Sequence, residues 1–208
     1  MKNENIKEII LMQGNPLSGK STLVSEFKKR FEKENKTVSI LKTVSNRDPK
    51  DLVKFTKDSI DETIPQTKKS KDDSYEMFIP QLNETKSEIN ILDATFHIKY
   101  RRDWIYKYCE ENNINLTIIS VTCTNDEEIK ETLRHRQENP DTKDNILSQW
   151  EQYACMKEQS EPIEKFELKE ESFKYPIIMF NRTTRELTAT KETEFVKEIM
   201  EIIKEFRP

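Results

Sequence analysis

The chain has 208 residues, of which 36% are charged and 34% hydrophobic, and its formal net charge is −4. This length and composition allow one α/β domain over residues 1–208 and exclude a disordered chain, because enough apolar residues are present to form a core. The 35 basic and 39 acidic residues are interspersed, so no extended positive surface is expected to attract long nucleic acids.

The cysteines and the apolar residues together indicate a cytoplasmic protein. Cys109, Cys123 and Cys155 are odd in number and widely spaced, which argues against a disulfide framework. No window approaches the roughly 18 apolar residues of a membrane span, so no membrane partner is expected. The N-terminus lacks a cleavage site, and no sequence feature specifies an oligomeric state.

Strands and helices are predicted to alternate along the chain. Short apolar runs predict strands, and apolar residues at a spacing of 3.6 predict amphipathic helices. Residues 61–74 are polar and are expected to form a loop that leads to a helix around residues 75–82. The predicted strands are 9–12, 38–41, 89–93, 116–121 and 175–180, and the other predicted helices are 20–34, 99–111, 127–136, 145–156 and 195–206.

This order of elements predicts an α/β fold of the three-layer P-loop NTPase type. Parallel strands joined by right-handed helical crossovers form an open sheet with helices on both faces. We therefore expect a mostly parallel, five-stranded sheet whose ligands bind at the carboxyl ends of the strands.

The two glycines of the chain, Gly14 and Gly19, frame a phosphate-binding loop. Between the first strand and the first helix, the sequence matches Gly-x-x-x-x-Gly-Lys-Ser/Thr. Backbone N–H groups of such a loop turn toward phosphates, the lysine reaches the β- and γ-phosphates, and the hydroxyl binds Mg²⁺. The residues expected to bind ATP and Mg²⁺ are Gly14, Asn15, Pro16, Leu17, Ser18, Gly19, Lys20, Ser21 and Thr22.

Asp93 ends the apolar strand 89–93, which is expected to lie beside the phosphate loop. There a carboxylate can bind Mg²⁺ together with Ser21 or accept a proton from an attacking hydroxyl. The alternative is that Asp93 caps the following helix. The two histidines, His97 and His135, are far apart in sequence, which gives no support to a metal site or to a nucleophile–histidine triad.

Asp93-Ala94-Thr95, followed by Arg101-Arg102, resembles the Asp-x-Thr/Asn and arginine segment of polynucleotide-kinase-like P-loop kinases, the AAA_33 group. That group includes polynucleotide 5′-kinases, 6-phosphofructo-2-kinase, L-seryl-tRNA(Sec) kinase and a related elongator-associated tRNA-modification factor. The resemblance implies that Thr95 and one of the two arginines, assigned to Arg102, contact the substrate. Phe96 departs from the asparagine of many relatives.

The resemblance also implies two further groups near the reacting phosphate. Asp48 is an approximate match to a carboxylate that acts on the acceptor, as a catalytic and substrate-binding residue. Arg134 and Arg136 resemble the arginines of a lid, placed at about 130–145, that closes over ATP. Guanidinium groups there would stabilise charge on the transferred phosphoryl group, although a solvated helix face is the alternative for both arginines.

The sequence therefore predicts an ATP-dependent kinase that transfers the γ-phosphoryl group to a hydroxyl of a small molecule, a nucleic-acid 5′ end or a tRNA. Lys20, Asp93, Arg134 and Asp48 are its expected catalytic residues, with ATP and Mg²⁺ as cofactors. The alternative is an ATPase that acts as a nucleotide-dependent RNA- or protein-binding factor of the tRNA-modification-associated type. The two differ in whether labelled phosphate reaches an acceptor or is released.

Overall fold

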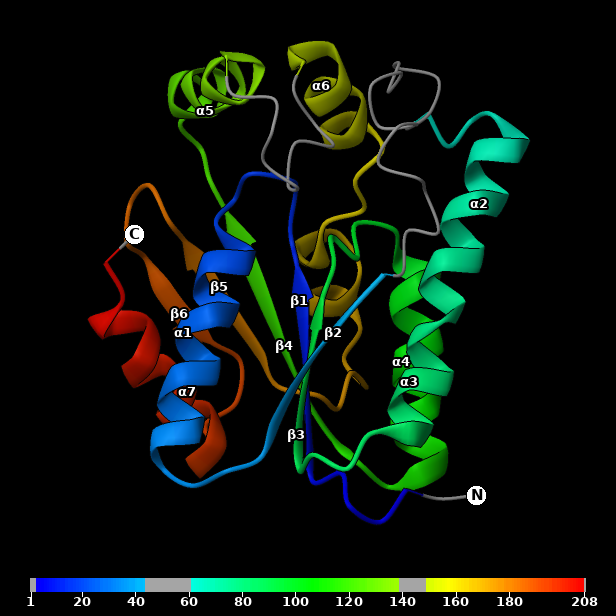
Figure 1. The fold of residues 1–208 in the computed structure, drawn as a ribbon, viewed down its shortest axis with the longest axis vertical. Coiled ribbons are helices and arrows are strands. Elements are labelled where there is room, and N and C mark those ends of the chain that lie inside the picture. The colour runs from blue at the N-terminus through cyan, green and yellow to red at the C-terminus, as the bar shows by residue number, and fades with distance from the viewer. Residues whose placement is uncertain (1–2, 44–60, 139–148, 208) are drawn as a thin grey trace.

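The computed structural model describes residues 3–43, 61–138 and 149–207. A six-stranded sheet lies at its centre, with helices on both faces (Figure 1). The elements in chain order are β1 (Glu8–Gln13), α1 (Lys20–Lys33), β2 (Val38–Lys42), α2 (Pro65–Glu76), α3 (Phe78–Glu84), β3 (Ile89–Asp93), α4 (Lys99–Asn112), β4 (Asn115–Thr122), α5 (Asp126–Glu138), α6 (Trp150–Glu158), the 3-10 turns η3 (Ile163–Lys165) and η4 (Glu167–Lys169), β5 (Ile177–Asn181), β6 (Leu187–Ala189) and α7 (Glu194–Glu205).

The strand order is β2-β3-β1-β4-β5-β6, and every pair is parallel except β5 with β6. The chain leaves the central strand β1 and places β3 on one side of it and β4 on the other. Ligands of open α/β sheets bind at such a switch point, beyond the carboxyl ends of the strands. The predicted three-layer α/β fold is confirmed, with six strands where five were expected.

Two hydrophobic cores cover the two faces of the sheet. Helices α1 and α7 pack on one face, around Phe27, Phe31 and Ile199. Helices α3 and α4 pack on the other face, around Phe78 and Ile105. In Figure 1 these two layers lie to the left and to the right of the sheet, and α5 and α6 lie above its carboxyl edge. The apolar stripes of α1 and α7 explain why these helices were predictable.

The structure differs from the predicted elements in two places. Residues 61–74 were expected to form a loop, yet α2 occupies Pro65–Glu76. Tyr75 is the only residue of α2 that is buried, so the helix has no apolar stripe to detect. The second feature is β6, an antiparallel edge strand of three residues that was not predicted. The predicted helix 145–156 begins at Trp150 in the described part of the chain.

No helix within the described ranges is long and apolar enough to cross a membrane.

Candidate functional site

The phosphate loop follows β1 and opens α1, as its sequence predicts. Gly14 and Gly19 have backbone φ angles of 143° and 96°, which residues with a side chain rarely adopt. The Gly14 N–H donates a hydrogen bond of 3.0 Å to the Thr95 carbonyl oxygen. A Cβ on Gly14 would lie 2.1 Å from the Val121 carbonyl oxygen. The segments after β3 and at the end of β4 therefore enclose the loop from both sides.

Lys20 lies inside the loop and is buried. Its Nζ donates to the carbonyl oxygens of Gly14 and Asn15, at 2.8 and 2.7 Å. Burial lowers the pKa of Lys20 to about 8, and the nearby Asp93 carboxylate opposes part of that shift. The ammonium thus has only neutral acceptors at hydrogen-bond distance among the described residues, and an anionic phosphate would be a stronger partner.

Ser21 and Asp93 meet at the first turn of α1. The Ser21 hydroxyl donates to Asp93 Oδ1 at 3.1 Å, although the two residues are 72 positions apart in the sequence. The Asp93 side chain is 6% exposed, and Lys42 Nζ lies 3.6 Å from its Oδ2. A hydroxyl and a carboxylate are oxygen ligands of the type that Mg²⁺ prefers.

The described residues contain no cluster of three or more metal-ligating His, Cys, Asp or Glu side chains. Mg²⁺ commonly keeps several waters and binds through one or two protein groups plus substrate phosphates. The Ser21 and Asp93 pair fits that type of site, because it provides two protein oxygens beside the phosphate loop.

A cavity of about 650 Å³ borders Ser21, Thr22 and Asp93. It extends along α1 and past the end of β2 to the C-terminal part of α7. The cavity is lined by charged side chains of both signs, which are Glu26, Lys29, Arg30, Lys42, Asp93, Glu205 and Arg207. The cavity therefore provides polar space next to the Asp93 carboxylate.

The two lid arginines lie on α5, above the carboxyl edge of the sheet (Figure 1). Arg134 is exposed and pairs with Glu131 on the same helix, at 2.6 Å. Arg136 is half-buried. Residues 139–145 of the expected lid, like Asp48, lie outside the described residues. The roles of these groups stay predictions.

Arg102 does not lie where a substrate could reach it, which contradicts the expectation from sequence. Its side chain and that of Glu167 are both 0% exposed, and their ion pair is 2.6 Å long. Arg102 Nη1 also donates to the Phe96 carbonyl oxygen at 2.9 Å. The neighbouring Arg101 is equally buried and binds Glu62 and Asp72. Both arginines hold α4 against other segments, because a buried guanidinium needs anionic partners.

Thr95 does lie at the phosphate loop, through its carbonyl group. Its hydroxyl, however, is bonded to the side chains of Tyr75 and His97, at 2.7 and 3.0 Å. Sequence reasoning missed this contact of His97, because the partners of a histidine two residues from a threonine depend on the backbone between them. Phe96, between the two residues, has a φ of 42°, in the left-handed region of the backbone.

Arg182 is a further residue that sequence reasoning missed. It follows β5, forms an ion pair with Glu128 of α5, and donates from Nη2 to the Cys123 sulfur at 3.5 Å. A Cβ on Gly19 would meet Arg182 Cδ at 3.0 Å. Its position directly after the parallel strand β5 is the feature of the sequence that could have identified it, because residues at such positions lie at the edge of the sheet where ligands bind.

Comparison with known proteins gives one family. The family model described as chromatin associated protein KTI12 matches residues 8–204. No curated protein sequence matches the chain. The fold is similar to that of Chaetomium thermophilum Kti12, whose structure is in complex with ADP-AlF3, with a TM-score of 0.63, 13% identity, and coverage of 94% of this chain and 95% of that one.

Two other solved structures share the fold at lower similarity. A fungal RNA kinase has a TM-score of 0.51 and 11% identity, covering 95% of this chain and 43% of that one. A structure from the PezAT toxin–antitoxin system of Streptococcus pneumoniae has a TM-score of 0.51 and 12% identity, covering 98% and 86%. These likenesses support a P-loop kinase-like fold and do not single out the polynucleotide-kinase-like group.

Proposed function

Since this chain belongs to the KTI12 family, we propose that it binds ATP with Mg²⁺ and hydrolyses it while assembling with an RNA or protein partner. Residues 1–208 act as a single P-loop unit in this proposal. The free thiols of Cys109, Cys123 and Cys155 are in keeping with a reducing, cytoplasmic compartment.

The contact between Ser21 and Asp93 carries the proposal. It joins the hydroxyl of the phosphate loop to the carboxylate at the end of β3, at 3.1 Å. In P-loop NTPases a hydroxyl and an acidic residue in this relation hold Mg²⁺ against the nucleotide phosphates. Bound Mg²⁺ would neutralise phosphate charge here, while Lys20 binds the β- and γ-phosphates and the loop N–H groups orient them. The ADP-AlF3 complex of the Chaetomium relative supports the same nucleotide class.

A kinase that phosphorylates a hydroxyl is the second candidate, and the cavity beside Asp93 favours it. The cavity volume of about 650 Å³ is of the size that small-molecule sites have. In that reaction Asp93 positions the acceptor hydroxyl or takes its proton, and the bond from the γ-phosphorus to the β,γ-bridging oxygen of ATP breaks. Asp48, Arg134 and Arg136 are the further candidates for this chemistry.

The destination of labelled phosphate separates the two candidates. The chain is incubated with Mg²⁺, γ-labelled ATP and either a tRNA pool or a panel of hydroxyl metabolites, and free and acceptor-bound label are measured. The binding-factor proposal expects only free phosphate, released faster when its partner is present. Label on an acceptor would establish the kinase instead. Lys20→Ala provides the blank, because it removes the ammonium that binds phosphate, and release by this variant at the wild-type rate would contradict both candidates.

We expect ATP binding to take up a proton at moderately alkaline pH. Burial holds the pKa of Lys20 at about 8 without nucleotide. Phosphates beside the ammonium raise that pKa, so the bound state holds more protons and the affinity falls by up to roughly tenfold per pH unit above about pH 8. Titration calorimetry in two buffers of different ionisation enthalpy, at about pH 8.5, measures the uptake.

The same titration at about pH 7 is the control, because Lys20 is then mostly protonated before ATP binds and the uptake should nearly vanish. Equal uptake at both pH values would show that another group titrates.

A further inference from the structure

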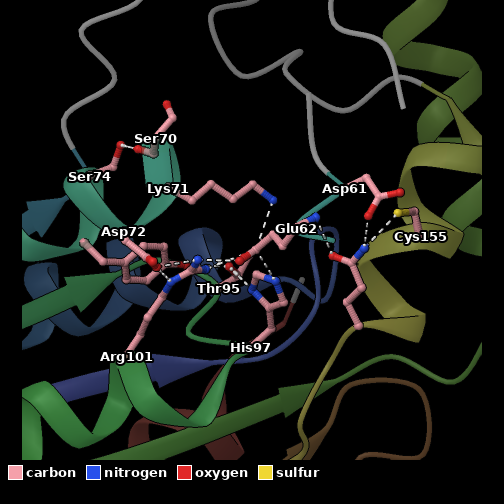
Figure 2. A network of polar contacts seen from close by, with 12 residues as sticks. Asp61, Glu62, Ser70, Lys71, Asp72, Ser74, Thr95, His97, Arg101 and Cys155 are labelled. Carbon is pink, nitrogen blue, oxygen red and sulfur yellow. Dashed lines mark hydrogen bonds and ion pairs between the residues drawn. The ribbon is translucent and has the colours of Figure 1, made fainter. Parts of the chain in front are cut away.

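A chain of polar contacts connects the phosphate loop to Glu62, which lies in residues 61–64 in front of α2. It is formed by side chains from the loop after β3, which holds Thr95 and His97, and from the region of α2, which holds Glu62 and Tyr75. Figure 2 shows the side chains of Thr95, His97 and Glu62 close together, with Arg101 extending from α4 to the Glu62 carboxylate. His97 is 1% exposed, so water does not compete for these bonds.

The donors and acceptors along this chain are assigned from the Glu62 carboxylate, which can only accept. Its Oε1 lies 3.0 Å from His97 Nε2, so we assign the proton of the neutral ring to Nε2. His97 Nδ1 is then an acceptor and takes the proton of the Thr95 hydroxyl, at 3.0 Å. With its own proton used in this way, Thr95 Oγ1 accepts from the Tyr75 hydroxyl at 2.7 Å, while the Tyr75 oxygen accepts the Phe96 N–H.

Charged groups around the ring keep this arrangement in one protonation state. Burial lowers the pKa of His97, and the contact with Glu62 raises it in part. Burial tends to raise the pKa of Glu62, but the contact with His97 and the hydrogen bonds from Arg101 hold that pKa well below its usual range. The charged groups that act on His97 are Glu62, Lys71 of α2 and Arg101 of α4, and both cations pair with the Glu62 carboxylate. The backbone N–H of Glu161 donates to the His97 carbonyl oxygen at 2.7 Å.

The backbone between Thr95 and His97 is strained, and the same groups hold it. Phe96 has a φ of 42°, which is unusual for a bulky residue, and its ring is 0% exposed. Its N–H is bonded to Tyr75 and its carbonyl oxygen to Arg102. The carbonyl group of Thr95, on the other side of this turn, accepts the Gly14 N–H at 3.0 Å. A change at His97 can therefore reach the phosphate loop through Thr95, and a change at Glu62 can reach it through His97 and Thr95.

We propose that Tyr75, Thr95, His97 and Glu62 form a positioning relay, which sets the place of the Thr95 carbonyl group at the phosphate loop through the contacts of the Thr95 hydroxyl, and which couples that loop to residues 61–64 before α2. The proposal rests on the proposed function, because its kinetic consequence is an effect on ATP turnover. His97 and Glu62 are positioning residues in it, since they act through Thr95.

Two matched tyrosines test the relay by kinetics. Tyr75 and Tyr108 are both 7% exposed, and each hydroxyl bonds to a side chain of another element. Tyr75→Phe removes the hydroxyl that bonds to Thr95 and accepts the Phe96 N–H. We expect kcat to fall roughly tenfold while KM for ATP stays within about twofold, because Lys20 and Ser21 are untouched. Tyr108→Phe removes a bond to Asn83 outside the relay and should leave kcat unchanged. Equal losses in the two variants would overturn the proposal.

Two substitutions of His97 are expected to lower kcat to different extents. His97→Asn keeps an acceptor near the Nδ1 position, whereas His97→Phe removes both ring nitrogens. We expect kcat to decrease from the wild type to His97→Asn and further to His97→Phe. The wild-type enzyme should also lose kcat as acid protonates His97, because the ring then has no acceptor for the Thr95 proton, and His97→Asn should lack that step. A graded loss of stability with unchanged kcat would contradict the relay.

A spectroscopic test does not depend on turnover. The chain has only two histidines, so a His135→Gln variant leaves one imidazole, that of His97, in a nitrogen NMR spectrum. We expect the Nε2-protonated tautomer, a pKa below the ordinary value, and a shift of the ring signals when Mg²⁺ and a non-hydrolysable ATP analogue are added. The Nδ1-protonated tautomer would overturn the relay. If the wild type lacks turnover, the proposed function fails, whereas the tautomer still decides on the relay.

Discussion

Gly14→Ala is expected to abolish ATP binding and to destabilise the protein. The added Cβ would lie 2.1 Å from the Val121 carbonyl oxygen, an impossible contact with the backbone of a central strand. The φ of 143° at Gly14 adds strain for any residue with a side chain. Overpacking and backbone strain of this kind cost roughly 3 kcal/mol or more, which corresponds to a decrease in Tm of roughly 6–12 °C for a chain of this size.

Gly19→Ala is the matched control for this prediction. Its φ of 96° is also strained, but the new Cβ would meet Arg182 Cδ at 3.0 Å, and that side chain can move. Thermal unfolding and ATP titration of both variants give the comparison. We expect a smaller decrease in Tm and weaker but measurable ATP binding for Gly19→Ala. If Gly19→Ala destabilised the protein more than Gly14→Ala, the contact with the Val121 carbonyl oxygen of β4 would not be the reason that position 14 needs glycine.

The parts of the fold that could be predicted are those that bury a regular apolar pattern. The strand 9–12 and the helix 195–206 are examples, because continuous or periodic burial appears directly in the sequence. Helix α2 could not be found in this way. Its one buried residue is Tyr75, and distant contacts hold the helix in place, such as that of Asp72 with Arg101 at 2.8 Å. Tertiary contacts of this kind leave no local signal.

The residues of the candidate site differ in the same way: some follow from a local sequence pattern and others depend on distant contacts. Lys20, Ser21 and Asp93 come together as predicted, because the phosphate loop and a strand end are both fixed by local pattern. The resemblance to the polynucleotide-kinase-like family implied that Arg102 contacts the substrate, and the sequence could not correct this because an exposed and a buried arginine look alike in it. Its partner Glu167 lies 65 positions away, in a 3-10 turn without a recognisable pattern.

Asp93→Asn is expected to retain ATP binding and to lose turnover. The amide keeps the size of the carboxylate and can still accept the Ser21 hydroxyl proton, which now lies 3.1 Å from Oδ1. It removes the negative charge that would bind Mg²⁺ and position the attacking group. Loss of such a preorganised group typically costs roughly 100- to 1,000-fold in kcat. We expect the Kd for ATP to change by less than about threefold, since the loop N–H groups and Lys20 remain.

Asp103→Asn is the control for this substitution. Asp103 lies on α4, outside the site, and pairs with Lys99 at 2.8 Å on the surface, where an ion pair contributes little. Steady-state turnover of both variants, measured over a range of Mg²⁺ concentrations, separates two roles of Asp93. If Asp93 binds Mg²⁺ chiefly, excess Mg²⁺ should restore part of the lost rate. If it chiefly positions the attacking water or hydroxyl, the rate should stay low at every Mg²⁺ concentration.

Near-full turnover of Asp93→Asn would contradict both roles. Asp93 would then act on structure alone, through its bond to Ser21 and its contact with Lys42. The same result would move the search for a carboxylate to Asp48, which was the other candidate from sequence. Lys20 and the loop N–H groups would still bind phosphate, so such an outcome would leave the nucleotide site in place. Only the residue assigned to position the attacking water or hydroxyl would change.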